Sequence, residues 1–324
     1  MTKRIAENIG TALLEAIVFL GVAATIWVSW QATDGVSPFF AFGASNASTT
    51  VVVGNNAPSV TSVVLNGGSA ITLTANTTTN VNVTVTISDN NGCSDITSGT
   101  TTVMMYRTSF GSSSCMTGAN NLYCYLATSF TNSSTCGPSI SVNATTTFAV
   151  YYFAQATDGS SAFSSSDWTA TVVFKDLAQS TGTADSTGRE LNTLTALDVT
   201  TSSINYGTLS ASSTTGGVNQ VTTSTNAGNS STTLRLSAIA TLTSGANSIA
   251  TTSQRYSTSS FTFAGTSTAL QQTATDVPGS FLTAPTSTTN VLRPYFWGLE
   301  VPAGTATGTY NGTTLFTAVF ATST

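Results

Sequence analysis

The side chains able to do chemistry in this sequence are few, and their types exclude most catalytic designs. Histidine is absent, and 8 Lys and Arg stand against 13 Asp and Glu among 324 residues. Without histidine the commonest general base and metal ligand is missing, so we expect no catalytic residues, no enzyme activity and no cofactor. A formal net charge of −5 provides no basic surface for phosphate backbones, so nucleic acid is not an expected partner.

The four cysteines are the next candidates, and all of them lie between residues 93 and 136. If the domain is exported, as we expect from the N-terminal segment described below, an even number indicates two disulfides, which three pairings would satisfy. If Thr101–Tyr106 and Tyr123–Phe130 pair antiparallel, residues that face each other have numbers summing to about 230. Two cysteines then meet at the base of this hairpin and two close its distal loop, which gives the bridges Cys93–Cys136 and Cys115–Cys124. Zinc is the alternative, but no Cys-x₂-Cys pair and no histidine support it, so we expect no metal there.

The segment 89–95, Asp-Asn-Asn-Gly-Cys-Ser-Asp, concentrates the carboxylate and amide oxygens that calcium prefers. Its glycine does not stand where an EF-hand requires one, and no glutamate follows at the necessary spacing. An ordinary turn at the end of a strand accounts for the same residues. We therefore assign no metal site to this segment.

One carboxylate, Glu15, is the only charged residue of the apolar run Thr11–Trp30, which is 20 residues long. A helix of this length crosses the hydrocarbon core of a bilayer, so we predict a transmembrane helix over residues 11–32. Lys3 and Arg4 precede it, which places the N-terminus in the cytoplasm and the rest of the chain outside.

A lone carboxylate within a membrane span is unfavourable unless it has a partner. A short basic leader over residues 1–10 that ends in Gly10, with Glu15 five residues further on, resembles the N-terminus of type IV pilins and related pseudopilins. The resemblance implies that a prepilin peptidase cuts after Gly10 and that Glu15 pairs with the N-terminal ammonium of a neighbouring subunit. It also implies self-association through the helix. Thr11 departs from the family pattern, because a bulky apolar residue usually stands first in the mature chain.

Two other interpretations of the N-terminus stay open. The segment could be a plain signal anchor, with Glu15 only one turn inside the membrane. It could also be a secretion signal that is cleaved near the small residues Ala41–Ser45, although the apolar stretch is longer than such signals usually have.

The remainder of the chain is predicted to be β-structure. Of its 324 residues, 111 are Ser or Thr, and the apolar residues alternate with them, as in strands that expose one face. Residues 33–54 and 179–192 are predicted linkers of small polar residues, and they separate β-sandwich domains over 55–178 and 193–324. The strands expected in the first domain are Val60–Leu65, Ile71–Thr74, Val81–Ile87, Thr101–Tyr106, Leu122–Phe130, Thr147–Phe153 and Trp168–Phe174. Those expected last in the second are Phe261–Ala264, Arg293–Glu300 and Thr314–Phe320.

About seven short strands separated by turn residues are typical of an immunoglobulin-like sandwich. The first domain opens on Ala57-Pro58-Ser59-Val60 and closes on the run 168–176, and both ends are similar to those of bacterial surface Ig-like modules. The second domain carries the turn Asn226-Ala227-Gly228-Asn229, which resembles the Hydin-type group of such modules. The expected fold class is mainly β, with one transmembrane helix followed by two Ig-like β-sandwich domains.

These features predict a non-enzymatic structural protein of the cell surface, a pilin-like subunit anchored or assembled through its N-terminal helix. The alternative is a monomeric, membrane-anchored surface protein that uses its Ig-like modules for adhesion or recognition. The membrane and further copies of the chain are the expected partners. The ligand, and the glycosylation of seven Asn-x-Ser/Thr sequons, stay open.

Overall fold

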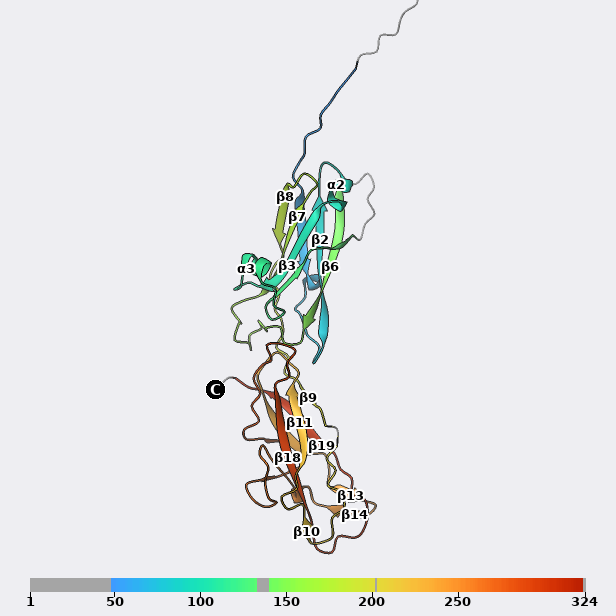
Figure 1. Ribbon diagram of the computed structural model, residues 1–324, viewed down its shortest axis with the longest axis vertical. Coiled ribbons are helices and arrows are strands. Elements are labelled where there is room, and N and C mark those ends of the chain that lie inside the picture. The colour runs from blue at the N-terminus through green and yellow to red at the C-terminus, as the bar shows by residue number, and fades with distance from the viewer. Residues whose placement is uncertain (1–47, 133–139, 202, 323–324) are drawn as a thin grey trace, which may run out of the picture. The chain divides into compact units, whose positions relative to one another are not determined.

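The computed structural model describes residues 48–132, 140–201 and 203–322. The chain divides into two compact units, Met1–Val53 and Gly54–Thr324, and the second contains every strand and helix of the described residues (Figure 1). The predicted leader, the transmembrane helix and most of the linker 33–54 lie outside the described residues. Within the described part of the chain, no helix is long and apolar enough to cross a membrane.

The first half of the larger unit consists of two antiparallel four-stranded sheets (Figure 1). One sheet has the order β1-β2-β6-β5, with β1 Ser59–Leu65, β2 Thr78–Ser88, β6 Ser141–Tyr151 and β5 Thr131–Asn132. The other has the order β4-β3-β7-β8, with β4 Cys124–Ala127, β3 Thr100–Arg107, β7 Trp168–Lys175 and β8 Thr181–Asp185. Apolar side chains of both sheets form one hydrophobic core. We call this two-layer half, residues 58–191, the first sandwich.

Alternation of side chains explains how β2 fills this core. Val81, Val83, Val85 and Ile87 are all buried, and the residues between them are exposed or half-buried, as the sequence predicted. In the opposite sheet Trp168, the first residue of β7, is fully buried, and its indole N–H donates a hydrogen bond of 2.8 Å to the carbonyl of Gln155. The core therefore takes apolar surface from one face of each sheet.

Strand β3 is covered on both of its faces. Val103 and Met105 pack into the main core, whereas Met104 and Tyr106 pack into a smaller cluster beneath helix α3, Ser112–Thr117. A strand covered on both sides no longer needs polar residues at alternate positions. This explains the continuous apolar run from 103 to 106.

The predicted register of the β3–β4 hairpin is confirmed. Val103 faces Ala127 and Tyr106 faces Cys124, so the facing numbers sum to 230 in both pairs. The predicted strands Val60–Leu65, Val81–Ile87, Thr101–Tyr106 and Trp168–Phe174 also lie within observed strands.

The prediction of a linker over residues 179–192 is wrong. Five residues of this stretch form β8, which pairs with β7 along its whole length, and Leu191 is fully buried in the core of the first sandwich. Gly182, one of the small residues that suggested a linker, is required by packing. A Cβ atom at Gly182 would lie 2.4 Å from the carbonyl oxygen of Pro58, so only glycine fits where β8 passes the start of the sandwich.

Two of the predicted strands do not form, although the structure describes their residues. Ile71–Thr74 contributes only an isolated parallel bridge between Ile71 and Leu191, although Ile71 and Leu73 are both buried. Phe261–Ala264 lies in an irregular segment, and Ala264 has a positive φ of 68°, which no strand permits. Ile71, Leu73 and Phe261 are buried all the same, so these side chains reach the interior from irregular backbone.

The second half, residues 197–320, has its own sheets. The larger sheet has the order β16-β15-β18-β11-β9, with β10 also paired to β18. Its strands are β16 Thr268–Ala269, β15 Gln254–Ser257, β18 Leu292–Val301, β11 Gln220–Asn226, β9 Leu197–Val199 and β10 Ser213–Thr214. The smaller sheet has the order β17-β12-β19, with β17 Thr275–Asp276, β12 Thr232–Ala238 and β19 Thr314–Phe320. A separate hairpin joins β13 Leu242–Ser244 to β14 Asn247–Ile249.

The core of the second half lies between its two larger sheets. Tyr256, Tyr295 and Trp297 of the larger sheet and Leu234 and Leu236 of β12 form one buried cluster. The predicted strands Arg293–Glu300 and Thr314–Phe320 are confirmed as β18 and β19.

The two halves meet at a hydrogen-bonded junction, which we define as residues 192–196 together with the turn Asn226–Asn229. The Asn229 side chain accepts a hydrogen bond from the Leu194 amide at 2.6 Å and donates to the carbonyls of Ala154, at 3.0 Å, and Asn192, at 3.2 Å. Its own amide donates to the Leu194 carbonyl. A buried amide side chain with all of these bonds made holds the segments around it in one arrangement.

Glycine is the only residue that fits at position 228 of the junction. A Cβ atom there would lie 2.0 Å from the Leu194 carbonyl oxygen and 3.0 Å from the Ala196 nitrogen, and both are backbone atoms. The turn therefore packs directly against the segment that connects the two halves.

Replacing this glycine tests whether the junction contributes to stability. Gly228→Ala is expected to lower the free energy of unfolding by roughly 1–3 kcal/mol, because the backbone must shift to admit the methyl group. Gly159→Ala is the matched control, since nothing lies within 4 Å of a Cβ atom at Gly159. Urea unfolding followed by circular dichroism measures both variants. Equal midpoints for Gly228→Ala and the control would contradict the tight packing of the junction.

Candidate functional site

The structure leaves the predicted processing and assembly residues untested. Gly10, Thr11 and Glu15 lie outside the described residues, and so does Cys136. Cys93 is disulfide-bonded and 2 % exposed, at the start of helix α2, Cys93–Thr97. The structure does describe the predicted distal disulfide, and also the segment 89–95, to which the sequence assigns no metal site.

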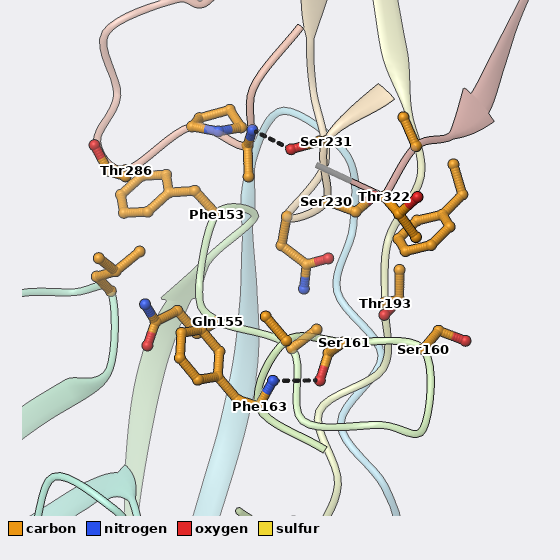
Figure 2. A pocket seen from close by; sticks show the side chains of 18 residues that line it. Phe153, Gln155, Ser160, Ser161, Phe163, Thr193, Ser230, Ser231, Thr286 and Thr322 are labelled. Carbon is orange, nitrogen blue, oxygen red and sulfur yellow. Dashed lines mark hydrogen bonds between the residues drawn. The ribbon is translucent and has the colours of Figure 1, made fainter. Parts of the chain in front are cut away.

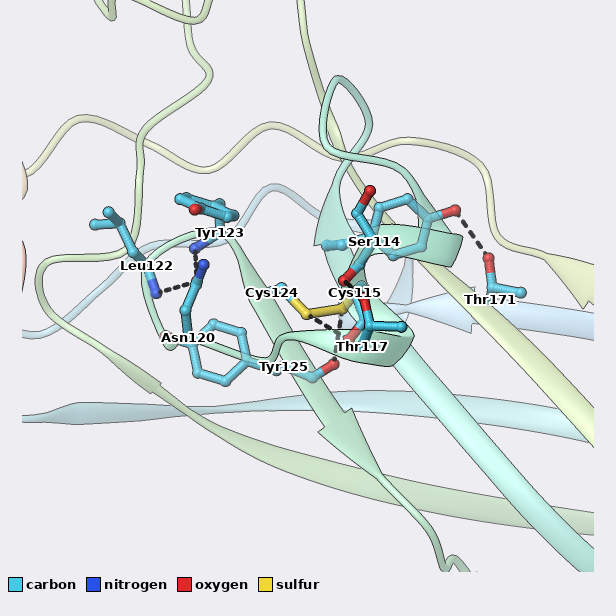
Figure 3. The surroundings of a disulfide bond; sticks show 10 residues. Ser114, Cys115, Thr117, Asn120, Leu122, Tyr123, Cys124, Tyr125 and Thr171 are labelled. Atoms are coloured by element: carbon cyan, nitrogen blue, oxygen red, sulfur yellow. Dashed lines mark hydrogen bonds between the residues drawn. A yellow bond between two sulfur atoms is a disulfide. The ribbon is translucent and has the colours of Figure 1, made fainter.

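The predicted disulfide between Cys115 and Cys124 is confirmed (Figure 3). It joins helix α3 to the start of β4, and both cysteines are fully buried. Beside it the Tyr106 hydroxyl forms a hydrogen bond of 2.9 Å with the Thr171 hydroxyl, between neighbouring strands β3 and β7. The bridge thus closes the loop over the outer face of β3 and shields that face from water.

Three carboxylates converge at one end of the first sandwich. Asp89 and Asp95 belong to the turn after β2 and to α2, and Asp176 directly follows β7. One oxygen from each carboxylate lies within 4.8 Å of the others. Asp89 is 2 % exposed, Asp176 is fully buried and Asp95 is half-buried. We call these three residues the acidic trio.

Backbone amides hold each carboxylate of the trio in place. The Asn91 amide donates to Asp89 Oδ1 at 2.8 Å, the Leu177 amide donates to Asp95 Oδ1 at 3.1 Å, and the Ser180 amide donates to Asp176 Oδ1 at 2.8 Å. The second oxygen of Asp176 accepts from Asn55 Nδ2 at 2.9 Å. These bonds come from the turns themselves, so the loop backbone sets the position of each carboxylate.

No ion pair formed by the described residues includes a carboxylate of the trio. Among the described residues the one ion pair is Arg235–Asp276, in the second half. Two unit charges about 4 Å apart interact by roughly 4 kcal/mol at an effective dielectric constant of 20, and burial strengthens the repulsion. Asp89 Oδ2 is buried and has no hydrogen-bond partner, which is unusual for a buried polar atom. Three carboxylates so placed repel one another wherever they are ionised.

Sequence reasoning identified two members of the trio and missed the third. The segment that contains Asp89 and Asp95 predicts an ordinary turn and not a calcium loop, because its glycine is misplaced for an EF-hand and no glutamate follows at the necessary spacing. Asp176 stands 81 positions after Asp95 and is brought beside it by the pairing of β3 with β7. The sequence contains one signal for the third member, an aspartate directly after a strand of buried residues. Only the order of the strands shows that this aspartate lies beside the segment 89–95.

A pocket of about 380 Å³ opens at the junction of the two halves (Figure 2). Phe153, Gln155 and Phe163 line it from the first sandwich, and Ser230 and Thr286 line it from the second half. Figure 2 shows these labelled side chains around one shared space. The lining combines aromatic rings with hydroxyl and amide groups, a composition suited to a small polar ligand with an apolar face.

An arginine supports one wall of this pocket. The Arg107 guanidinium lies over the Phe163 ring, 3.7 Å from its centroid, in a cation–π contact. Burial lowers the pKa of Arg107 from its ordinary value, against a smaller opposing effect of Tyr123. Arg107 thereby fixes the loop that carries Phe163.

Comparison with known proteins adds no assignment to these sites. No protein-family model matches the chain, and no curated protein matches it either.

Proposed function

We propose that this chain is a non-enzymatic structural protein of the cell surface, a pilin-like subunit assembled through its N-terminal helix. In this proposal Thr11–Trp30 forms the membrane helix, and a prepilin peptidase cleaves after Gly10. The N-terminus lies in the cytoplasm, and the unit Gly54–Thr324 projects from the outer surface.

One observation carries the proposal. The unit Gly54–Thr324, which we call the body, is rich in β-structure and contains a disulfide, and it follows an apolar segment with a single carboxylate. Cys115 and Cys124 are bridged in the body, and disulfides persist in oxidising compartments outside the cytoplasm. A body outside the membrane is also the orientation that Lys3 and Arg4 favour.

The outward-facing side chains of β2 and β6 support the proposal that this part of the chain lies outside the membrane, in water. On β2 and β6 the outward residues include Asn82, Thr84 and Asn143, and all three are exposed. Hydroxyl and amide groups hydrate a sheet without adding charge, which agrees with a charged fraction of only 6 %.

The layering of the first sandwich supports a surface module of the Ig-like kind. In the first sandwich two antiparallel sheets enclose one core around a buried tryptophan, Trp168. This arrangement is shared by many extracellular β-sandwiches. The proposed architecture is therefore one membrane helix followed by two Ig-like modules that the junction fixes together.

The pocket at the junction favours a second candidate function. A monomeric, membrane-anchored surface protein would use this pocket, with Phe153 and Phe163 as its aromatic walls, for recognition or adhesion. The two candidates differ in whether Glu15 is needed for assembly.

Substitution of Glu15 tests the proposal, and the abundance of assembled filaments is the quantity measured. Glu15→Ala is expected to reduce assembled filaments at least ~10-fold, because the partner ammonium loses its counter-charge, a change that typically costs ~2–5 kcal/mol. The chain should still reach the membrane, since the substitution makes the span more apolar. Negative-stain electron microscopy of sheared surface material, with membrane fractionation of the cells, measures both effects.

Glu7→Ala is the matched control, because Glu7 lies before Gly10 and would be removed with the leader. Filaments from the control should be as abundant as from the unmodified chain. Filaments of Glu15→Ala at the level of the control would rule out the pairing. A displayed chain that forms no filaments, with or without Glu15, would favour the monomeric candidate.

A further inference from the structure

We propose that the acidic trio of Asp89, Asp95 and Asp176 binds a calcium ion that ties the turn after β2 to the turn after β7. This inference concerns the folded body alone and does not depend on how the chain is anchored.

The geometry of the trio is that of a partly built cation site. Its three carboxylates bring oxygens within 4.8 Å of one another, close enough for a single ion to contact all three at Ca²⁺–oxygen distances of about 2.3–2.6 Å. Three different backbone amides already orient them, so the ligands need little rearrangement on binding.

A second observation points to a cation independently of the clustering. Asp89 is 2 % exposed, and its Oδ2 atom has no hydrogen-bond partner in the protein. A buried carboxylate oxygen without a donor is normally neutralised or coordinated to a metal. Asp176, which is fully buried, has both of its oxygens held by donors, and it adds a further negative charge to the same place.

The ligand chemistry selects calcium among the common ions. The chain has no histidine, and Cys93 of the same segment is disulfide-bonded, so neither imidazole nor thiolate is present to favour zinc or copper. Carboxylate oxygens suit hard cations, and turns of this kind tolerate the irregular coordination that Ca²⁺ accepts and Mg²⁺ does not. Water molecules would complete the coordination shell on the side of the half-buried Asp95.

The position of the site gives the ion a structural role. Asn55 donates to Asp176, and the Asn56 amide donates to Asn91 Oδ1 at 2.6 Å, so the first residues of the compact unit bind to the same two turns. Calcium would therefore stiffen the end of the first sandwich at which the chain enters it.

Calcium titration of the full-length chain in detergent tests the proposal. After treatment with a chelator, ~10 mM CaCl₂ should raise the Tm by roughly 3–8 °C, as expected for a site of the strength found in extracellular modules. Isothermal titration calorimetry should show one saturable Ca²⁺ site per chain, with weaker binding of Mg²⁺.

The variants Asp89→Asn and Asp95→Asn should each weaken Ca²⁺ binding at least ~10-fold, because each removes one ligand charge. Both should fold without calcium, since they relieve repulsion, and Asp95→Asn alters only a half-buried group. Asp198→Asn, an exposed aspartate on β9, is the matched control and should keep the full response. An unchanged Tm and no binding heat with CaCl₂, or an equal calcium response in Asp89→Asn and the control, would overturn the assignment.

Discussion

The close approach of Gly228 to the backbone of Leu194 is the constraint on which the rest of the body depends. The connecting segment is bound on one side by the turn Asn226–Asn229 and on the other by Asp158, which accepts hydrogen bonds of 2.6 Å from the Thr193 amide and hydroxyl. Two hydrophobic cores with separate sheets thereby belong to one compact unit. In tandem surface modules the usual connection is a flexible linker, which leaves the modules to move independently.

In the proposed structural role, a fixed junction would affect how the body transmits force. A structural subunit transmits force through its connections, and hydrogen bonds to backbone groups resist the small rotations that a Gly- and Ser-rich linker permits. The acidic trio would act similarly at the opposite end of the first sandwich, by fixing the turns that receive Asn55 and Asn56. The disulfide, the proposed ion and the junction would then reinforce three separate places of the compact unit.

Local patterns predicted the parts of the fold that local physics determines. The alternation in Val81–Ile87 fixed which side chains face the core, and residue numbers alone gave the β3–β4 register and the Cys115–Cys124 bridge. Failures occurred where a non-local contact decides. Gly182 appeared to belong to a linker because its packing partner, Pro58, is more than a hundred residues away, and Asp176 joins the trio only through strand order. The N-terminal predictions stay predictions, because those residues lie outside the described part of the chain.

The most direct test of the central claim is the mass of the mature chain, measured by intact-protein mass spectrometry on material taken from the cell surface. The account predicts a chain that begins at Thr11, because a prepilin peptidase cuts after Gly10 before helices assemble around Glu15. A chain that still begins at Met1 would contradict this claim and leave a signal-anchored display protein. A start near Ala41–Ser45 would contradict it as well, because the apolar segment would then have been removed before the body reached the surface.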